Sequence, residues 1–281
     1  MLAALTGDPS ADVPGFTATL ANWQYRPGAE VTAGYSVSYA DPSGRPVQED
    51  LFVTTADVAA PATLSRDHLS FAVWRHPGDP LLPGLAAACD PATVMSWLQV
   101  TPNHFDLTLL AYRPLRRAVL RATADGSETY LKVLRPERAD RLAVRQNLLA
   151  DAGLTPALLA RPAPGVLLTP RASGRSLAHV LATHDDPELP AAADLIGLLD
   201  ALPNQLCDLP RRPAWPDRLD FHTATAVDRL PAHTERLHAL QRKLQGVLDT
   251  APVGPLVPTH GDFYEANLFV DSPRLMLIDL D

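Results

Sequence analysis

The sequence contains few of the residues that mark several classes of protein. Its 281 residues include only two cysteines, Cys89 and Cys207, which form neither a Cys-x-x-Cys motif nor a disulfide framework. This excludes a disulfide-rich secreted fold and is typical of a protein in a reducing cytoplasm. No apolar run approaches the roughly 20 residues that span a bilayer, and Met1–Ser10 lacks the basic region of a signal peptide. We therefore expect a cytoplasmic protein with no membrane partner.

Positive charge is also scarce, and lysine is the rarer cation. The chain has 24 Lys and Arg against 32 Asp and Glu, a formal net charge of −8. This balance disfavours nucleic acid as a partner, because such binding neutralises phosphates. Only Lys132 and Lys243 are lysines. Hydrophobic residues make up 46% of the chain, which is enough for a buried core and excludes disorder as its overall state.

Hydrophobic patterning divides the chain into regions of different character. Alternation over Glu30–Tyr39 predicts a strand that leads into a turn, and Leu69–Arg75 predicts another strand. Asp90 and Pro91 predict the N-cap and first residue of a helix that runs to about Leu98. We expect an α+β protein with three parts: a β-rich extension over 1–104, a small lobe over 105–172 and a helical large lobe over 173–281.

The second β-rich unit has the clearest hairpin signal. Arg117–Thr123 and Glu128–Leu134 flank Asp125-Gly126, a dipeptide that favours a tight two-residue turn. A helix is predicted to begin at about Glu137 and to end at Gly153, because glycine suits the position just after the last helical residue. Further along, apolar spacing predicts a helix over His233–Leu248 with one face in a core: Leu237, Leu240, Leu244, Val247 and Leu248.

Three oxygen-bearing side chains lie close together near the end of the sequence, at Asp262, Asn267 and Asp279. Leu268–Val270 and Leu275–Ile278 predict a hairpin around a turn. Paired residue numbers in an antiparallel hairpin sum to a constant, so a turn centred on residue 273 places Asn267 opposite Asp279. Two of these oxygens suit Mg²⁺, and the remaining carboxylate can orient and deprotonate a hydroxyl.

The alternative interpretation is a polar surface hairpin with ordinary turn aspartates. Asp271 is interpreted as turn chemistry alone. Asp281 is either a second carboxylate near the metal or an exposed chain end.

The same segment resembles a known family. The matching residues are His260-Gly261-Asp262, then Asn267 and Ile278-Asp279. Together they are similar to the signature of aminoglycoside phosphotransferases and choline-kinase-like enzymes, which share the protein-kinase fold. The resemblance extends from about Leu107 to Asp281, and the large N-terminal extension is similar in layout to maltokinase-like members. It implies a two-lobe kinase-like fold and an enzyme that transfers phosphate from ATP, with Mg²⁺, to a hydroxyl of a small metabolite (a sugar, an aminoglycoside or an amino alcohol).

The resemblance also implies a role for each residue of the motif. Asp262 would be the catalytic base, and His260 would brace the catalytic loop. Asn267 and Asp279 would bind magnesium. Lys132 would be the strand lysine that contacts the nucleotide phosphates. The charge distribution fits, since residues 112–145 carry nine basic and four acidic side chains whereas residues 258–281 carry five acidic side chains and one arginine.

Two features depart from the family pattern. The turn where a glycine-rich loop would cover the phosphates reads Arg113-Pro-Leu-Arg-Arg117, so Arg116 and Arg117 are the candidates to bind phosphate there. The helix after Lys132 has no clear glutamate partner for it, and Glu137 and Gln146 are the nearest candidates.

Other functions remain open at this stage. A non-catalytic nucleotide-binding module, or pseudokinase, is favoured by both departures. A metallophosphoesterase would need further metal ligands at strand ends, whereas His222, His233 and His238 lie in or beside predicted helices.

The position of the motif in the chain leads to a further expectation. In the family, helices that follow the metal aspartate shape the acceptor pocket, and this sequence stops two residues after Asp279. We expect a truncated helical lobe, weak or no turnover, and apolar surface that promotes self-association. Alternatively, the N-terminal extension or a second subunit supplies the missing cover.

Overall fold

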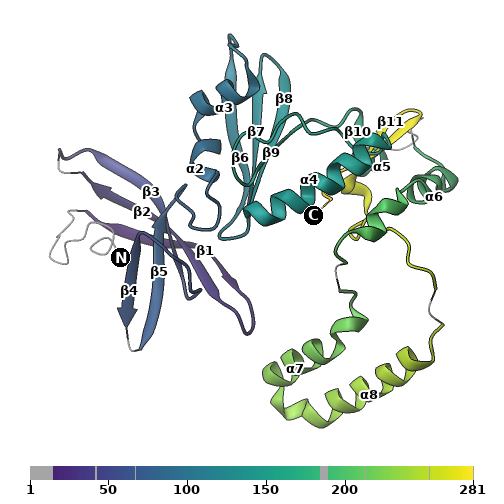
Figure 1. Cartoon of the computed structure of the whole chain (residues 1–281). Coiled ribbons are helices and arrows are strands. Elements are labelled where there is room, and N and C mark those ends of the chain that lie inside the picture. Colours follow the sequence, from purple (N-terminus) through teal and green to yellow (C-terminus); the bar gives the residue numbers. More distant parts are fainter. Residues whose placement is uncertain are drawn as a thin grey trace.

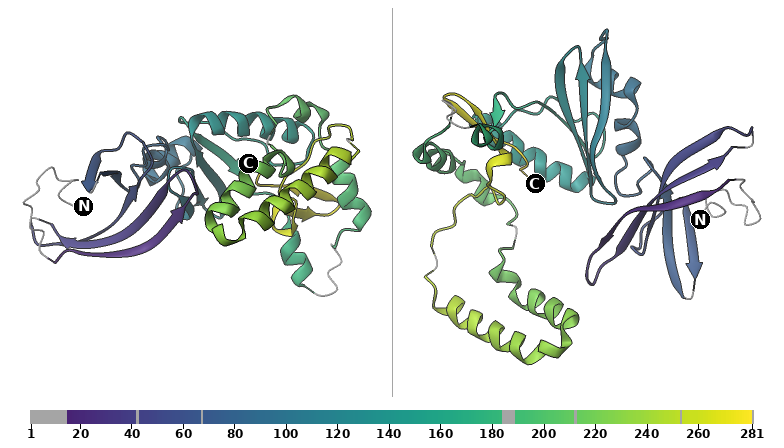
Figure 2. Two further views of the ribbon diagram at one scale, coloured as in Figure 1. Left: turned by 90° about the horizontal axis from the view of Figure 1, so that it is seen from below. Right: turned by 180° about the vertical axis from the view of Figure 1, so that it is seen from behind.

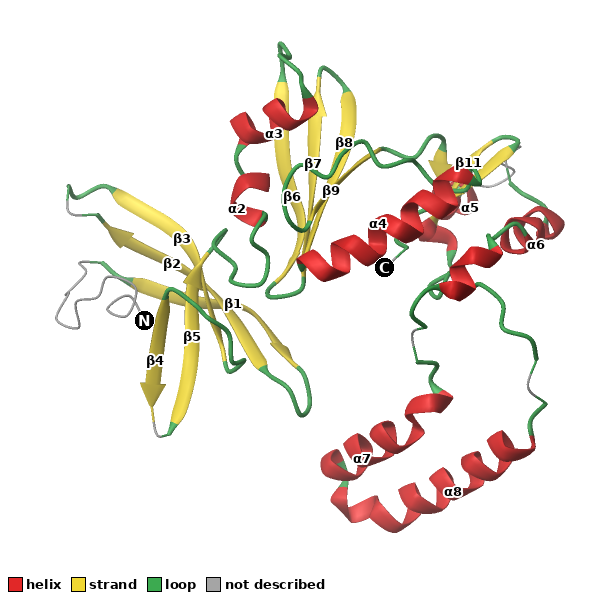
Figure 3. Cartoon of the chain, viewed as in Figure 1, coloured by secondary structure: helices red, strands yellow, loops and turns green. Residues whose placement is uncertain are grey.

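A computed structural model describes residues 15–41, 43–66, 68–183, 189–211, 213–252 and 254–280. Antiparallel sheets form the first part of the chain, and helices with a small further sheet form the rest (Figures 1 and 3). The alternatives stated for Asp281 concern a position outside the described residues.

No helix in the described ranges has the length and apolar character needed to cross a membrane.

The first sheet has the strand order β1-β2-β3-β5-β4. Its strands are β1 (Thr17–Tyr25), β2 (Val31–Ala40), β3 (Pro46–Thr54), β4 (Ala62–Arg66) and β5 (Leu69–Arg75). β2 and β5 occupy the two segments in which strands were predicted. Val37, Leu51, Val73 and Trp74 are fully buried, so this extension has apolar packing of its own.

The second sheet has the order β6-β7-β8-β9 and lies in the small lobe. Its strands and neighbouring helices are α2 (Leu85–Ala88), α3 (Pro91–Leu98), β6 (Phe105–Arg113), β7 (Arg117–Ala124), β8 (Ser127–Leu134), α4 (Pro136–Asp151) and β9 (Val166–Pro170). Asp125 and Gly126 join β7 to β8 with φ values of 46° and 88°, as a type I′ turn requires, so the predicted hairpin is confirmed. Asp90 caps α3 as predicted, because its Oδ2 accepts the N–H of Thr93 at 2.9 Å.

The two faces of the small-lobe sheet pack against different helices. Leu85 of α2 and Val94 of α3 share a buried cluster with Leu168 of β9. The neighbouring Leu167 points to the opposite face and packs with Leu142 of α4. Residues 82–98, which the sequence assigned to the extension, thus pack against the sheet of the small lobe (Figure 1).

The remaining elements form the helical part of the chain and a small sheet of order β10-β11-β12. They are β10 (Arg175–Ser176), α5 (Leu177–Ala182), α6 (Ala192–Asp200), α7 (Leu219–Arg229), α8 (Thr234–Thr250), β11 (Leu268–Asp271), β12 (Arg274–Leu277) and the 3₁₀ turns η1 (Asn204–Asp208), η2 (Pro216–Arg218), η3 (Pro231–His233) and η4 (Glu265–Asn267). Leu268, Val270 and Leu277 are buried in the same cluster as Leu142 of α4. This cluster therefore anchors the β11–β12 hairpin to the helix that follows Lys132.

One predicted core face is wrong. Helix α8 forms as expected, but Leu240, Leu244 and Val247 are 52%, 42% and 59% exposed. Figure 2 shows the reason: α7 and α8 form a hairpin that extends away from the lobe on two irregular connections. The apolar spacing correctly predicted the helix, but the described residues cover only part of its apolar face. Self-association through this face stays a prediction.

Gly174 gives a direct test of the small sheet. It has a φ of +80°, and a Cβ at this position would lie 1.9 Å from the carbonyl oxygen of Val270 in β11. Gly126 has a similar φ of +88° but no atom within 4 Å of its added Cβ. We expect Gly174→Ala to lower the free energy of unfolding by about 3 kcal/mol and Gly126→Ala by about 1 kcal/mol, since only the first adds a backbone clash to the strain. Denaturant unfolding of both variants measures the difference, and equal losses would contradict the packing of β10 on β11.

Candidate active site

The β11–β12 hairpin carries most of the motif, in a register one step from the predicted one. Leu268 pairs with Leu277 and Asp271 with Arg274, so only Ser272 and Pro273 form the loop. The paired numbers sum to 545 rather than the predicted 546, and the N–H of Ile278 donates to the carbonyl of Asn267 at 3.0 Å. The prediction that Asn267 lies opposite Asp279 is therefore wrong by one residue.

Asp279 lies just beyond the hairpin in a strained backbone conformation. Its φ is +56°, in the left-handed region that non-glycine residues seldom adopt. This turn takes the chain away from the straight continuation of β12. Conformations of this kind occur in tight turns and also cluster at functional sites.

Asp262 and Asn267 are held together at the start of the hairpin. The Nδ2 of Asn267 donates to the carbonyl of Asp262 at 3.0 Å and lies 3.5 Å from its Oδ2. Asn267 is only 5% exposed, whereas Asp262 is exposed. This bond fixes the orientation of the amide, so that its Oδ1 faces away from the Asp262 carbonyl and suits a cation.

His260 connects the loop before the hairpin to the segment before Asp279. Its Nε2 donates to the carbonyl of Ile278 at 2.9 Å. Its Nδ1 is buried and has no hydrogen-bond partner among the described residues. The contact ties the Asp262 loop to the backbone that carries Asp279.

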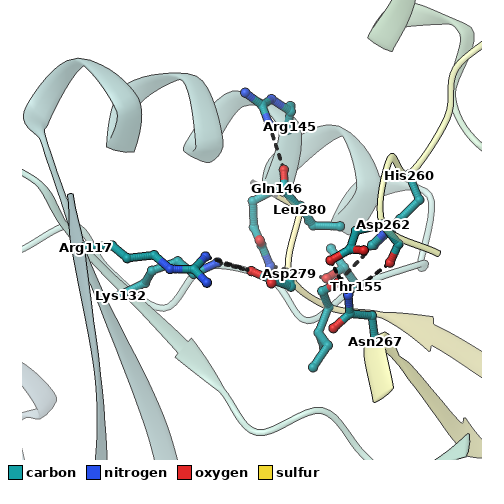
Figure 4. Close-up of polar contacts among 11 residues, drawn as sticks. Arg117, Lys132, Arg145, Gln146, Thr155, His260, Asp262, Asn267, Asp279 and Leu280 are labelled. Atoms are coloured by element: carbon teal, nitrogen blue, oxygen red, sulfur yellow. Dashed lines mark hydrogen bonds and ion pairs between the residues drawn. The ribbon is translucent and has the colours of Figure 1, made fainter. Parts of the chain in front are cut away.

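The small lobe supplies two cations to the same place. The Nζ of Lys132 in β8 lies 2.7 Å from Oδ1 of Asp279, and Nη1 of Arg117 in β7 lies 3.8 Å from the same oxygen (Figure 4). The side chains of Lys132, Arg117 and Asp279 are 20%, 28% and 33% exposed. Residues far apart in the sequence thus meet at one partly open position, and the structure brings Lys132 and Arg117 to the motif.

Helix α4 supports the backbone on both sides of Asp279. Gln146, a candidate partner for Lys132, instead donates to the carbonyl of Pro156 at 2.5 Å and lies 3.4 Å from the hydroxyl of Thr155. Thr155 in turn donates to the carbonyl of Leu277 at 2.7 Å. Arg145 donates to the carbonyl of Leu280 at 2.8 Å.

The other candidate partner, Glu137, is exposed in the first turn of α4, whereas Asp279 contacts Lys132 directly. Sequence reasoning missed Thr155 and Arg145 as supports of Asp279, because nothing in their local pattern distinguishes them.

The turn between β6 and β7 concentrates positive charge. Burial, followed by the charges of Arg26, Arg138 and Arg113, lowers the pKa of the Arg116 guanidinium. An anion bound at this turn would relieve the repulsion. Of the two arginines predicted to bind phosphate, Arg117 contacts Asp279, and Arg116 lies in this positively charged turn.

A cavity of about 440 Å³ lies between the two lobes, and sequence reasoning did not find it. It is lined by Arg121, Glu128, Tyr130, Arg171, Arg175, Ser176, His179 and Phe269. Tyr130 and Lys132 lie two residues apart on β8 and therefore on the same face of the sheet. Glu128 lies 3.5 Å from Arg121 and 3.6 Å from Arg171, so the cavity wall is polar as well as aromatic.

The residues present fit a magnesium ion that shares its ligands with a nucleotide. The described residues contain no group of three or more His, Cys, Asp and Glu side chains suited to a metal. Mg²⁺ bound with a nucleotide usually takes one or two protein oxygens and completes its shell with phosphates and water. The carboxylate of Asp279 and the amide oxygen of Asn267 would provide such a pair.

Comparison with known proteins is consistent with this geometry. A family model described as the phosphotransferase enzyme family matches residues 106–281. The chain belongs to this family. Membership confirms the resemblance predicted from the motif and, with the antiparallel small-lobe sheet followed by helices, the α+β kinase-like fold.

Solved structures similar to this family member include a choline/ethanolamine kinase family protein from Mesorhizobium loti, with 19% identity and a TM-score of 0.44 over 69% of this chain and 62% of that one. The chain thus spans less than two thirds of that protein. The aminoglycoside phosphotransferase APH(4)-Ia has 17% identity and a TM-score of 0.43 over 68% of this chain and 71% of its own. A Plasmodium vivax ethanolamine kinase has 11% identity and a TM-score of 0.41 over 67% and 60%. A comparison with curated proteins finds no match.

Proposed function

We propose that this chain transfers the terminal phosphoryl group of ATP to a hydroxyl of a small metabolite in the cytoplasm. The observation that carries the proposal is the 2.7 Å contact between Lys132 of the small lobe and Asp279, next to Asn267 and Asp262. In the proposed reaction Lys132 would bind phosphate, Asn267 and Asp279 would supply two oxygens to a metal, and the exposed carboxylate of Asp262 would act as the base. Phosphoryl transfer needs these groups because catalysis rests on positioning and on charge stabilisation.

The reaction assigns each residue a task. The acceptor hydroxyl lies against Asp262, which takes its proton as the new oxygen–phosphorus bond forms. The bond between the γ-phosphorus and the bridging oxygen breaks, and ADP leaves. Lys132, with Arg117 beside it, stabilises the phosphate charge. Magnesium, held by Asn267 and Asp279, would neutralise charge on the phosphates.

We infer that the adenine and ribose occupy the cavity between the lobes. Tyr130 and Phe269 are aromatic residues on the two lobes that line it, and aromatic faces suit a planar base. Because Tyr130 shares a face of β8 with Lys132, a nucleotide in the cavity extends its phosphates toward the lysine.

A non-catalytic nucleotide-binding function is the second candidate. Lys132 pairs directly with the proposed metal aspartate. A metal bound by Asp279 has to share this carboxylate with the lysine. Nucleotide binding without acceptor-dependent release of ADP would identify this second function.

The nucleotide itself gives the first test. A ligand at 100 times its Kd stabilises a protein by about 2.7 kcal/mol if only the native state binds it. We expect MgATP to raise the Tm of the wild type and to raise that of Lys132→Ala much less. Lys243→Ala is the matched control, since Lys243 lies on the exposed part of α8. No shift for the wild type, together with no heat of binding in calorimetry at several temperatures, would overturn the proposal.

The acceptor is found by a screen. Sugars including maltose, aminoglycosides and amino alcohols are offered with MgATP, and release of ADP is followed for each. With one class of acceptor we expect ADP to be released faster than by hydrolysis of ATP alone. If the protein binds nucleotide but no acceptor increases ADP release, the second candidate is favoured.

A further inference from the structure

Asp79 is a buried carboxylate outside the region that matches the phosphotransferase family, which begins at residue 106. It is 4% exposed and lies between the first sheet and α2. One of its oxygens, Oδ1, accepts the N–H of Leu81 at 2.9 Å. The other, Oδ2, accepts two bonds of 2.7 Å from the small lobe, from the hydroxyl of Tyr112 and from the N–H of Leu115. A buried carboxylate needs such partners, because without them its charge would be strongly destabilised.

The network around Asp79 keeps these donors in place. Tyr112 also accepts a hydrogen bond of 3.3 Å from the indole of Trp74 in β5. Burial, followed by the charge of Asp79, raises the pKa of Tyr112, so its hydroxyl remains a donor. The first sheet and the small lobe are therefore joined by a specific hydrogen-bond network.

Leu115 is held by this network through its backbone and its side chain. Its φ is +63°, a left-handed conformation that is rare for leucine. Its N–H bonds Asp79, and its carbonyl accepts a 2.8 Å bond from Nε of Arg135 at the start of α4. Its side chain is 2% exposed and packs with Phe52 and Trp74 of the first sheet. Both peptide groups and the side chain are thus fixed by elements outside the turn.

The fixed turn determines the direction in which the next residues leave it. The N–H of Arg116 donates to the carbonyl of Arg113 at 3.0 Å, and Arg117 follows as the first residue of β7. Arg117 then places Nη1 3.8 Å from Asp279. A change in the Leu115 peptide would therefore redirect the arginine that shares the site with Lys132.

We propose that Asp79 is a positioning residue for nucleotide binding, which holds the turn over residues 113–117 so that Arg117 reaches the phosphates. This rests on the proposed function. It gives the N-terminal extension a role in the nucleotide site, through Arg117 of the small lobe. No residue of the extension is itself assigned a contact with the reacting atoms.

The substitution Asp79→Asn separates this role from simple packing. Asparagine has nearly the same shape, but only one of its two terminal atoms accepts a hydrogen bond. If the amide nitrogen takes the place of Oδ2, Leu115 loses its acceptor. If it takes the place of Oδ1, it faces the N–H of Leu81, and Leu115 keeps only a neutral oxygen, which is a weaker acceptor than a carboxylate. Both orientations therefore weaken the hold on the turn. The matched control is Tyr112→Phe, which removes a donor to the same oxygen and an acceptor of Trp74 but leaves the Leu115 bond intact.

Calorimetric titration with MgADP and with a non-hydrolysable MgATP analogue tests the proposal on the full chain. We expect Asp79→Asn to weaken binding by roughly tenfold and Tyr112→Phe by less than about twofold, even where both lower the Tm to the same extent. If Asp79 acts through Arg117, Asp79→Asn should have no further effect on affinity in an Arg117→Met background.

The outcomes distinguish the two proposals. A wild type that binds neither nucleotide overturns the proposed function and this inference with it. A wild type that binds, with an Asp79→Asn variant as tight as Tyr112→Phe, overturns the inference alone. An equal loss with and without Arg117 does the same, because it shows a general structural effect. Should Asp79→Asn not fold, Arg135→Lys takes its place, since it keeps the charge but loses the Nε donor to Leu115. Unchanged binding by that variant would also overturn the inference.

Discussion

Asp262→Asn should abolish most phosphoryl transfer while leaving nucleotide binding intact. The substitution removes the group that takes the proton of the acceptor hydroxyl, and a general base contributes about 10²- to 10⁴-fold to a rate. Binding should survive because Asn267 bonds the backbone carbonyl of residue 262, which the substitution keeps. Turnover is measured as ADP release with the acceptor found by screening, and affinity by titration with the MgATP analogue.

Glu265→Gln is the matched control for this variant. Glu265 is an exposed acid on the same loop, so its substitution removes the same charge without removing the proposed base. We expect its turnover to stay within about twofold of the wild type, since exposed substitutions away from the chemistry have small effects. Equal turnover of Asp262→Asn and the wild type would contradict the assignment of Asp262 as the base.

The sequence predicted the local elements of the site better than their register. The strand content of β11 and β12 follows from short apolar runs around turn residues, and both strands formed. The register depends on how many residues the turn itself uses, and Ser272-Pro273 alone form the loop where a longer turn was expected. One residue of difference was enough to move Asp279 out of the pair with Asn267, since the side-chain period of a strand is two.

Contacts between distant segments were beyond sequence reasoning for a different reason. The partner of Lys132 depends on how the whole small lobe packs on the C-terminal hairpin, and no local pattern encodes it. The search for a glutamate in α4 therefore missed the contact between Lys132 and Asp279. Likewise, Leu115 looks like an ordinary turn residue in the sequence, and only the fold shows its bond to Asp79.

The apolar stripe of α8 shows the limit of periodicity as a guide to burial. Spacing at helical intervals reports which face of a helix avoids water, but it does not identify what covers that face. In the described residues Leu237 and Leu248 are partly covered, whereas Leu240 and Val247 remain exposed. The helix was therefore predictable and its surroundings were not.

Asp279→Asn should remove the magnesium dependence of nucleotide binding. In the wild type we expect Mg²⁺ to strengthen ATP binding, and loss of a charged metal ligand should reduce that effect on the order of 100-fold. Asparagine is a better choice than alanine because residue 279 has a φ of +56°, and asparagine adopts the left-handed region more readily than most residues. The variant thus tests the carboxylate rather than the backbone.

The same substitution removes the charge of Asp279 beside Lys132, and this gives the experiment its sharpest readout. The ion pair of Lys132 with Asp279 is partly exposed, and such pairs contribute only about 0–1 kcal/mol, so its exchange for a metal and phosphates is not costly. Without the carboxylate the lysine still attracts phosphate, so binding of ATP in the presence of a chelator should be kept or strengthened. The ratio of affinities with Mg²⁺ and with chelator should therefore fall toward one in Asp279→Asn. Asp271→Asn, at the far end of the same hairpin, should keep the ratio of the wild type. A ratio in Asp279→Asn equal to that of the wild type would show that the metal binds elsewhere, and Asn267 would lose its assigned role with it.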